Sequence, residues 1–176
     1  MSFAASFVLG GFVFSFIEYA HHRYGGHSGA MGSRIRASHK AHHRDPMEGG
    51  VTYPTKLRQR IPLVALGSAI VGLIALPAGV IHSACVTGGA IAAYAYSEWF
   101  HHRMHHRAPR NRFERWMWRY HYVHHFRDPR TNYGFTSPLW DFVLGTARVE
   151  RSVRVPASRI PEWNEAIPGF EPYEPR

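Results

Sequence analysis

The sequence is poor in cysteine and uneven in its distribution of charge. Its single cysteine, Cys85, excludes an intrachain disulfide and a metal site built from paired cysteines. Lysine and arginine are absent from residues 1–20 and 61–100. Eight of the 21 basic residues lie in residues 21–60 and the other 13 in residues 101–176. Nucleic-acid-binding domains usually carry basic residues on the helices that also build the core, so we expect no nucleic-acid partner despite a formal charge of +9.

The stretches without basic residues are apolar and are candidates for membrane helices. Residues 2–17 are uncharged, and no lysine or arginine follows Met1 as it would in a secretory signal. In residues 61–100, Pro77 and Gly79 near the middle predict a turn between two helices. Each half is just long enough to cross the hydrocarbon core, so buried helices of a soluble protein are the alternative.

One helix followed by a hairpin returns residues 21–60 and 101–176 to the same side of the membrane. These two stretches contain 13 of the 14 histidines and all the basic residues, which predicts a cytoplasmic location. We therefore predict an all-α integral membrane bundle of about three membrane helices with a cytoplasmic, histidine-rich helical cap that holds a di-metal site. The membrane would be a cell inner membrane or one of the endoplasmic reticulum type. Residues 1–146 would form the catalytic domain and residues 147–176 an extended, proline-rich tail packed on the surface.

Aromatic and basic residues alternate shortly before the last histidine cluster. This pattern predicts an amphipathic helix that lies on the membrane and covers the metal site. The residues concerned are Arg112, Arg115, Trp116, Trp118, Arg119, Tyr120 and Tyr122.

The histidines occur in four clusters. Their sequences are HHRYGGH at 21–27, HKAHH at 39–43, HHRMHH at 101–106 and HYVHH at 121–125. The HxxHH pattern of the second and fourth clusters places all three histidines on one side of a helix. His22 and His27 are five residues apart, so they would not share one face of a continuous α-helix. Gly25 and Gly26 lie between them and would let the helix end unwind, which would bring His27 round to His22.

Metal binding is the simplest reason for this arrangement. Neutral imidazole binds iron, zinc, copper and nickel, and about ten facing histidines are enough for two ions with four or five ligands each. A pair of redox metals suits the activation of dioxygen. The carboxylate-rich di-iron sites of helical bundles combine Glu-x-x-His pairs with further glutamates, whereas Glu18 and Glu98 are the only acidic residues beside the first and third histidine clusters, so a di-metal site here must be nearly all imidazole. A solvated metal-sequestering tract is the alternative, but it does not explain the matched spacing.

These motifs resemble the fatty acid hydroxylase and sterol desaturase superfamily of integral membrane non-haem di-iron enzymes. The resemblance covers roughly residues 15–146. It is carried by EYAHHRYGGH at 18–27, HKAHH at 39–43, the HxxxH of 101–105, YHYVHHF at 120–126 and NYGFTSPLWDFVLGT at 132–146.

The resemblance implies a particular set of metal ligands. They are His22, His27, His39, His42, His43, His101, His105, His121, His124 and His125. Because the third cluster has doubled histidines, His102 and His106 are alternates for His101 and His105. Three acidic residues are expected to accept imidazole N–H groups and so orient the rings, namely Glu18, Glu98 and Asp141. For the two glutamates, a helix-end carboxylate facing water is the alternative.

The implied reaction is O2-dependent oxidation of a C–H bond in a fatty-acyl, sterol-like or related lipid, by hydroxylation or else desaturation. Two iron ions would serve it, although imidazole spacing alone also admits zinc, and zinc could occupy the purified protein. Electrons must come from an external donor, because the sequence has no flavin or haem motif, and the basic face would suit an acidic carrier such as a ferredoxin or cytochrome. A carotenoid ring hydroxylase is the nearest alternative enzyme. A non-enzymatic membrane metal-binding protein is the alternative from another class, although residues 61–97 offer it only His82.

Overall fold

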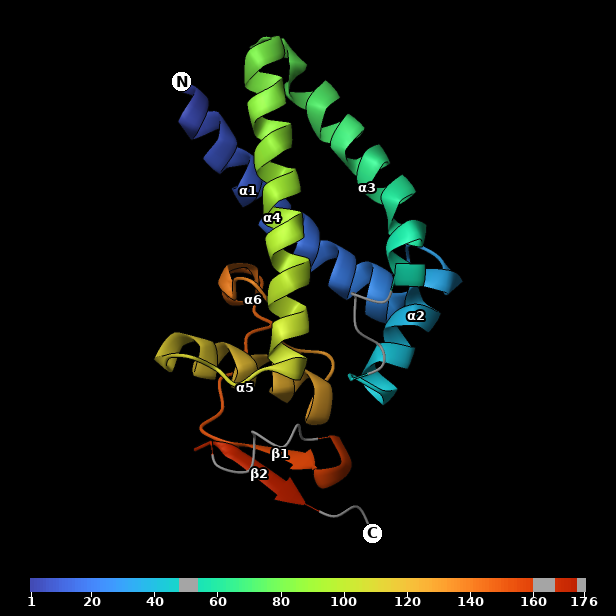
Figure 1. Ribbon diagram of the computed structural model, residues 1–176, viewed down its shortest axis with the longest axis vertical. Helices are drawn as coiled ribbons and strands as arrows, with labels where there is room; N and C mark the ends of the chain where they lie inside the picture. Colours follow the sequence, from blue (N-terminus) through green and yellow to red (C-terminus); the bar gives the residue numbers. More distant parts are fainter. Residues whose placement is uncertain (48–53, 160–166, 174–176) are drawn as a thin grey trace. The chain divides into compact units, whose positions relative to one another are not determined.

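The computed structural model describes residues 1–47, 54–159 and 167–173, and these residues are mostly helical (Figure 1). The chain divides into two compact units. Unit 1 comprises residues 1–18 and 51–99, and unit 2 comprises residues 19–50 and 100–176.

Unit 1 is built from three apolar helical segments. They belong to α1 (Phe3–Ala20), α3 (Pro54–Ala75) and α4 (Val80–His106). A short 3-10 turn, Leu76–Ala78, joins α3 to α4 as a hairpin (Figure 1), so the predicted turn is confirmed. Gly79 closes this turn with a φ of 99°, a conformation that glycine tolerates at little cost.

Within unit 1, α1 packs against α4 through glycine. A side chain at Gly10 would collide with the carbonyl of Val86, and one at Gly89 would collide with the carbonyl of Phe7. Small residues of this kind let helix backbones approach closely, as at the interfaces of membrane helices. His82 lies in the same helix pair, where its Nδ1 is 2.7 Å from Ser6 Oγ.

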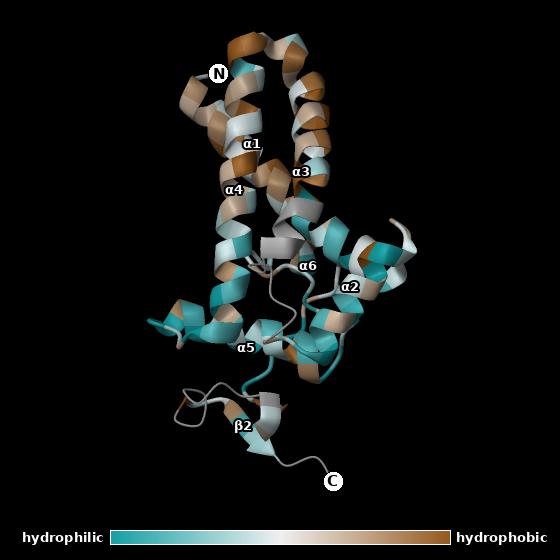
Figure 2. Ribbon diagram, turned by 45° about the vertical axis from the view of Figure 1, so that its right-hand side comes forward, coloured by the Kyte–Doolittle hydropathy of each residue, from teal (hydrophilic) through white to brown (hydrophobic). Residues whose placement is uncertain are grey.

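The helices of unit 1 expose large apolar side chains, and Figure 2 shows the hydrophobic residues along α1, α3 and the first part of α4. Two segments of the described chain, Phe3–Ser28 and Arg60–Ala78, are long and apolar enough to cross a membrane. None of the second segment is buried, although a core helix of a soluble protein would be. The first part of α4 forms the predicted helix but is less apolar, because it carries polar residues such as His82 and Tyr94.

Unit 2 contains the remaining elements. They are a π-helix η1 (His21–Ser28), α2 (Ser33–Arg44), the end of α4, α5 (Arg112–Phe126), α6 (Leu139–Val143), β1 (Val153–Pro156), a 3-10 turn (Ala157–Arg159) and β2 (Phe170–Tyr173). Asn111 begins α5 by accepting a hydrogen bond from the backbone N–H of Glu114, a standard N-cap. The apolar core of unit 2 comprises Phe100, Met104, Met117, Trp118, Tyr122, Val123, Val153, Val155 and Phe170.

The C-terminal segment contributes to this core. β1 and β2 pair in parallel with Val153 opposite Phe170, and β1 packs against α5. Val153, Val155 and Phe170 are buried. The tail is predicted to be extended, and strands are extended backbone; the pairing of β1 with β2 and the burial of their side chains are additional findings. Residues 160–166 and 174–176 of the predicted tail lie outside the residues that the structure describes.

Three aromatic residues of α5 that the sequence analysis places on the membrane surface are buried instead. Trp118, Tyr120 and Tyr122 are each at most 2 % exposed. The indole N–H of Trp118 donates to the carbonyl of Arg107, and the hydroxyl of Tyr122 donates to the carbonyl of Met104. The prediction is wrong for these three because their face of the helix packs into the core of unit 2.

Candidate metal centre

Ten histidines of unit 2 converge in two groups of five. The first group is His22, His27, His39, His43 and His124, and the second group is His42, His101, His105, His121 and His125. Within each group the ring nitrogens that could bind a metal all lie within 4.8 Å of one another. These are the ten histidines that the sequence predicts. The alternates His102 and His106 belong to neither group, and their rings contact each other at 4.2 Å between centroids.

The two HxxHH motifs divide their histidines between the groups in opposite ways. In α2, His39 and His43 join the first group, and the residue between them at the i+3 position, His42, joins the second. In α5 the i, i+4 pair joins the second group and His124 joins the first. The rings of His43 and His125, one from each group, stack at 4.3 Å, so the two groups are immediate neighbours.

A π-helix brings His22 and His27 together. The i to i+5 hydrogen bonds of a π-helix place residues five apart about one turn from each other. The helix end therefore does not unwind at Gly25 and Gly26, as the sequence suggested, but widens. Gly26 is needed for the close approach of η1 to α2, since a Cβ at Gly26 would lie 2.8 Å from the ring of His39.

Backbone carbonyls fix two rings of the first group. Nδ1 of His22 is 2.5 Å from the carbonyl oxygen of Tyr133, and Nδ1 of His124 is 2.6 Å from that of Thr131. A carbonyl can only accept, so each Nδ1 carries the proton and each Nε2 presents its lone pair to the group.

The Nε2 atoms cannot satisfy one another by hydrogen bonding. Nε2 of His39 lies 3.1, 2.8 and 2.9 Å from the Nε2 atoms of His22, His27 and His43, but a single proton can serve only one of these contacts. In the second group, both ring nitrogens of His125 are buried without a hydrogen-bond partner among the described residues. Converging lone pairs of this kind suit a cation, so the donor set fits a metal ion in each group.

The rings are also in the protonation state that metal binding requires. Burial lowers the pKa of His43 to about 3, and it lowers the pKa of His39, His121, His124 and His125 well below the ordinary value. Repulsion from neighbouring rings that would also be charged lowers the pKa of His39 and the three α5 histidines further. These five imidazoles are therefore neutral at physiological pH, as metal ligands must be.

The spacing of the donors favours more than four ligands around an ion. The close Nε2 to Nε2 contacts within the two groups range from 2.8 to 3.2 Å. Two nitrogens about 2.1 Å from one ion lie about 3.0 Å apart at a right angle and about 3.4 Å apart at the tetrahedral angle. The close contacts are nearer to the right-angle spacing, and each group offers five nitrogens to one ion.

Asp141 supports the first group indirectly. It is buried, and its carboxylate accepts the backbone N–H groups of Tyr133 and Gly134 at 2.8 and 2.7 Å and the hydroxyl of Thr146 at 2.7 Å. Within the described residues, none of these hydrogen bonds reaches an imidazole. The predicted direct hydrogen bond from an imidazole to Asp141 is thus replaced by an indirect link. Asp141 holds the backbone of Tyr133, and the carbonyl of Tyr133 accepts a hydrogen bond from Nδ1 of His22.

The two predicted glutamates lie in unit 1. Glu98 forms an ion pair with Arg60, and Glu18 is buried. Their role in orienting histidine rings stays a prediction.

Sequence reasoning missed the two carbonyls and Asn132, the residue between them. Asn132 has a φ of 57°, a left-handed conformation that asparagine adopts more readily than most residues. The only signal was the Asn-Tyr-Gly sequence of the closing motif, and it does not reveal which backbone oxygens face the histidines.

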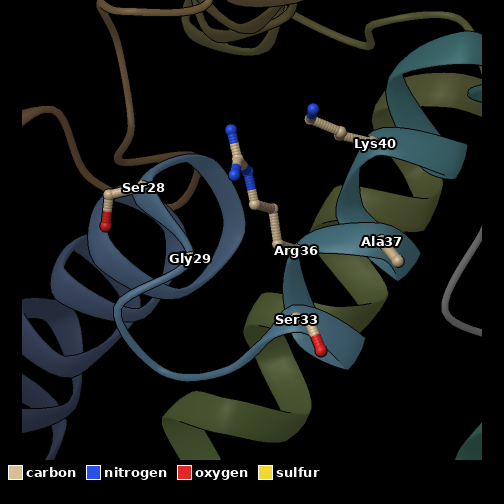
Figure 3. A pocket seen from close by; sticks show the side chains of 6 residues that line it. All are labelled: Ser28, Gly29, Ser33, Arg36, Ala37 and Lys40. Carbon is tan, nitrogen blue, oxygen red and sulfur yellow. The ribbon is translucent and has the colours of Figure 1, made fainter.

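A basic cavity of about 310 Å³ lies in unit 2 between η1 and α2. Arg36 and Lys40, one turn apart on α2, extend toward the same space (Figure 3). The other lining residues are Ser28, Gly29, Ser33 and Ala37. Because α2 also carries His39 and His43, this positive surface lies on an element of the candidate metal centre.

Together, the apolar helices and the paired five-histidine groups define a class of helical, membrane-associated protein with a histidine-rich metal centre. The sequence profile of the fatty acid hydroxylase family matches residues 7–146, and the chain therefore belongs to this family. The resemblance seen in the sequence is confirmed for the fatty acid hydroxylases.

Individual relatives agree with the family assignment. The chain is 29 % identical to the dihydroceramide fatty acyl 2-hydroxylase FAH1 of Arabidopsis thaliana, over 84 % of this chain and 62 % of that protein. It is 26 % identical to human fatty acid 2-hydroxylase, over 85 % of this chain and 41 % of that protein. A solved structure of full-length scs7p, in which only the hydroxylase domain is visible, matches with a TM-score of 0.71 and 26 % identity, over 83 % of this chain and 56 % of that chain. The chain thus spans less than two thirds of each of them.

Proposed function

We propose that this protein hydroxylates the acyl chain of a lipid with O2, using two iron ions held by the ten histidines of the two groups. The observation that carries the proposal is the pair of adjacent groups of five converging imidazoles. Bound iron would supply the one-electron chemistry with O2, which zinc cannot supply because it has no redox chemistry.

The names of the relatives guide the choice of substrate and position. FAH1 is a dihydroceramide fatty acyl 2-hydroxylase and the human relative is a fatty acid 2-hydroxylase. By analogy, the substrate here is a fatty-acyl lipid, free or in a ceramide-like amide, and the oxidised carbon is the one next to the carbonyl group. Desaturation and carotenoid ring hydroxylation are less well supported, because neither relative is named for them.

Hydroxylation by O2 requires two electrons and two protons, since one oxygen atom enters the substrate and the other leaves as water. An acidic electron carrier such as a ferredoxin or cytochrome is the proposed source. Unit 2 carries 18 of the 21 basic residues, and the cavity at Arg36 and Lys40 is one positive surface on which such a carrier could dock. Replacing both residues with glutamate should raise the KM for the carrier, and the effect should weaken as salt is added.

The residues of the chain itself have two further tasks. Burial of the imidazoles keeps them neutral and keeps water from the reacting groups. The carbonyls of Thr131 and Tyr133 hold two rings in the tautomer that offers Nε2.

The test is metal analysis of anaerobically purified protein together with lipid analysis of cells that express it. We expect two irons per chain and an accumulation of 2-hydroxyacyl lipids that is absent from a His124→Ala control. Less than one iron per chain, or lipids identical to those of the control, would overturn the proposal.

A further inference from the structure

The two groups of histidines are held in different ways. In the first group, His22 comes from η1 and His124 from α5, and both donate to one short segment, residues 131–134, which we name the carbonyl loop. The accepting carbonyls, of Thr131 and Tyr133, are two residues apart. Asn132 separates them with its φ of 57°.

The side chain of Asn132 fixes the middle of the carbonyl loop. It is fully buried, and its amide N–H groups donate to the carbonyls of Tyr120 and Arg148 at 2.9 and 2.8 Å. Its amide oxygen accepts the backbone N–H of Arg148 at 2.6 Å, and its own backbone N–H donates to the carbonyl of Thr146 at 3.0 Å. Three side-chain hydrogen bonds therefore hold Asn132, and none of them is to a histidine.

Asp141 fixes the other end of the loop through the N–H groups of Tyr133 and Gly134. Gly134 is necessary for this approach, because a Cβ there would collide with the carbonyl of Ser137 and lie 3.1 Å from the carboxylate of Asp141. The carbonyl loop is thus held from both sides by buried polar groups.

The second group lacks this support at two of its rings. Nδ1 of His121 and Nδ1 of His125 are buried without a hydrogen-bond partner among the described residues. The rings of this group lie against aromatic side chains, as His101 does against Phe135 at 4.5 Å and His105 against Tyr122 at 5.8 Å between centroids. Packing restrains where a ring lies, but it does not select a tautomer as a hydrogen bond does.

We infer that the carbonyl loop, with Asn132 and Asp141 as its positioning residues, orients the ligands of the first group and makes the two metal positions unequal. This inference rests on the proposed function only in that both groups bind metal. Disturbing the loop should weaken the metal of the first group and leave that of the second nearly unchanged. Loss of a partner that orients a metal-binding histidine typically lowers metal affinity by roughly 10- to 100-fold.

The experiment is a cobalt(II) titration of the full chain in detergent, after removal of its metal, followed by electronic absorption. Asn132→Gly is the main variant, because glycine keeps the left-handed backbone accessible and removes only the three side-chain bonds. The wild type should bind two equivalents of cobalt. The variant should bind one equivalent as tightly as the wild type and the second at least about 10-fold more weakly.

Asn111→Gly is the matched control. Asn111 is also an asparagine that holds backbone beside α5, but its side chain accepts the N–H of Glu114 in the first turn of the helix and makes no bond to the carbonyl loop. Because glycine is also tolerated as an N-cap, this variant should lower thermal stability only slightly and leave both equivalents of cobalt tightly bound. If Asn132→Gly unfolds the protein, Asp141→Asn tests the same inference. The amide has the shape of the carboxylate but places an N–H group beside the N–H groups of Tyr133 and Gly134.

The outcomes separate the two proposals. A wild type that binds fewer than two equivalents would contradict the di-metal function itself. If the wild type binds two equivalents and the loop variants weaken both equally, or neither, then only the inference about the carbonyl loop is wrong.

Discussion

Glu114 is a buried carboxylate that is fully occupied by arginine. It accepts hydrogen bonds from Arg103 at 2.8 Å and from the side chain and backbone N–H of Arg110 at 2.6 Å. Burial alone would raise the pKa of Glu114, but the bonds from Arg110 and Arg103 outweigh it and lower the pKa from 4.5 to about 2. Because Glu114 lies in the first turn of α5, its charge also supports the helix that carries three of the ten histidines.

A depressed pKa in the folded state makes stability depend on pH in a defined direction. The stabilisation from Glu114 should be complete above pH 4.5, the pKa expected for the unfolded chain, and should be lost as the pH falls toward 2. Its size is at most about 3 kcal/mol. In thermal melts between pH 6 and about 2, Glu114→Gln should be less stable than the wild type at the upper end, and the difference should shrink at the lower end. A constant difference across this range would contradict the assignment.

Gly26 tests the packing around the first group. An added methyl group would lie 2.8 Å from the His39 ring, which cannot move without leaving the group. Gly26→Ala should therefore weaken metal binding by roughly 10-fold or more while α2 still folds. Gly67→Ala is the matched control because a Cβ there meets no atom within 4 Å. Equal metal content in the two variants would show that the ring of His39 can adjust.

At the level of elements, sequence reasoning succeeded where the signal is periodic. The HxxHH spacing predicts that the histidines of α2 converge with those of α5, and the apolar runs around Pro77 predict a helical hairpin. It failed where geometry depends on contacts that the pattern does not contain. The π-helix of η1, the carbonyl of Tyr133 and the burial of Trp118 all depend on which elements pack together, and a single sequence does not carry that information.

The division of each HxxHH motif between the two groups gives a prediction at this scale. His43→Ala combined with His124→Ala removes two ligands from the first group only, so the protein should retain one metal per chain. His42→Ala combined with His124→Ala removes one ligand from each group and should weaken both metals. Metal content measured after dialysis against a weak chelator distinguishes the two double variants. Identical losses in both would mean that the ten histidines act as one site.

At the scale of the whole molecule, apolar surface and positive charge lie in different units. Unit 1 exposes large apolar side chains on α1, α3 and α4, as helices in contact with lipid do. Unit 2 has the histidines of the candidate centre and most of the basic residues. Positively charged segments of membrane proteins are retained in the cytoplasm, so we propose that the metal centre faces the cytoplasm and that the turn between α3 and α4 faces the opposite side.

The single native cysteine makes this topology testable. In a Cys85→Ser background, a cysteine introduced by Ser38→Cys would lie on the exposed surface of α2, and one introduced by Ala78→Cys would lie in the exposed turn after α3. A membrane-impermeant maleimide applied to inverted membrane vesicles should label the first cysteine and not the second, and intact cells stripped of any outer envelope should give the reverse. Lipid hydroxylation by each variant serves as the control for folding. Labelling of both cysteines from the same side would show that the α3–α4 hairpin does not cross the membrane, and the cytoplasmic assignment of the metal centre would then lose its basis.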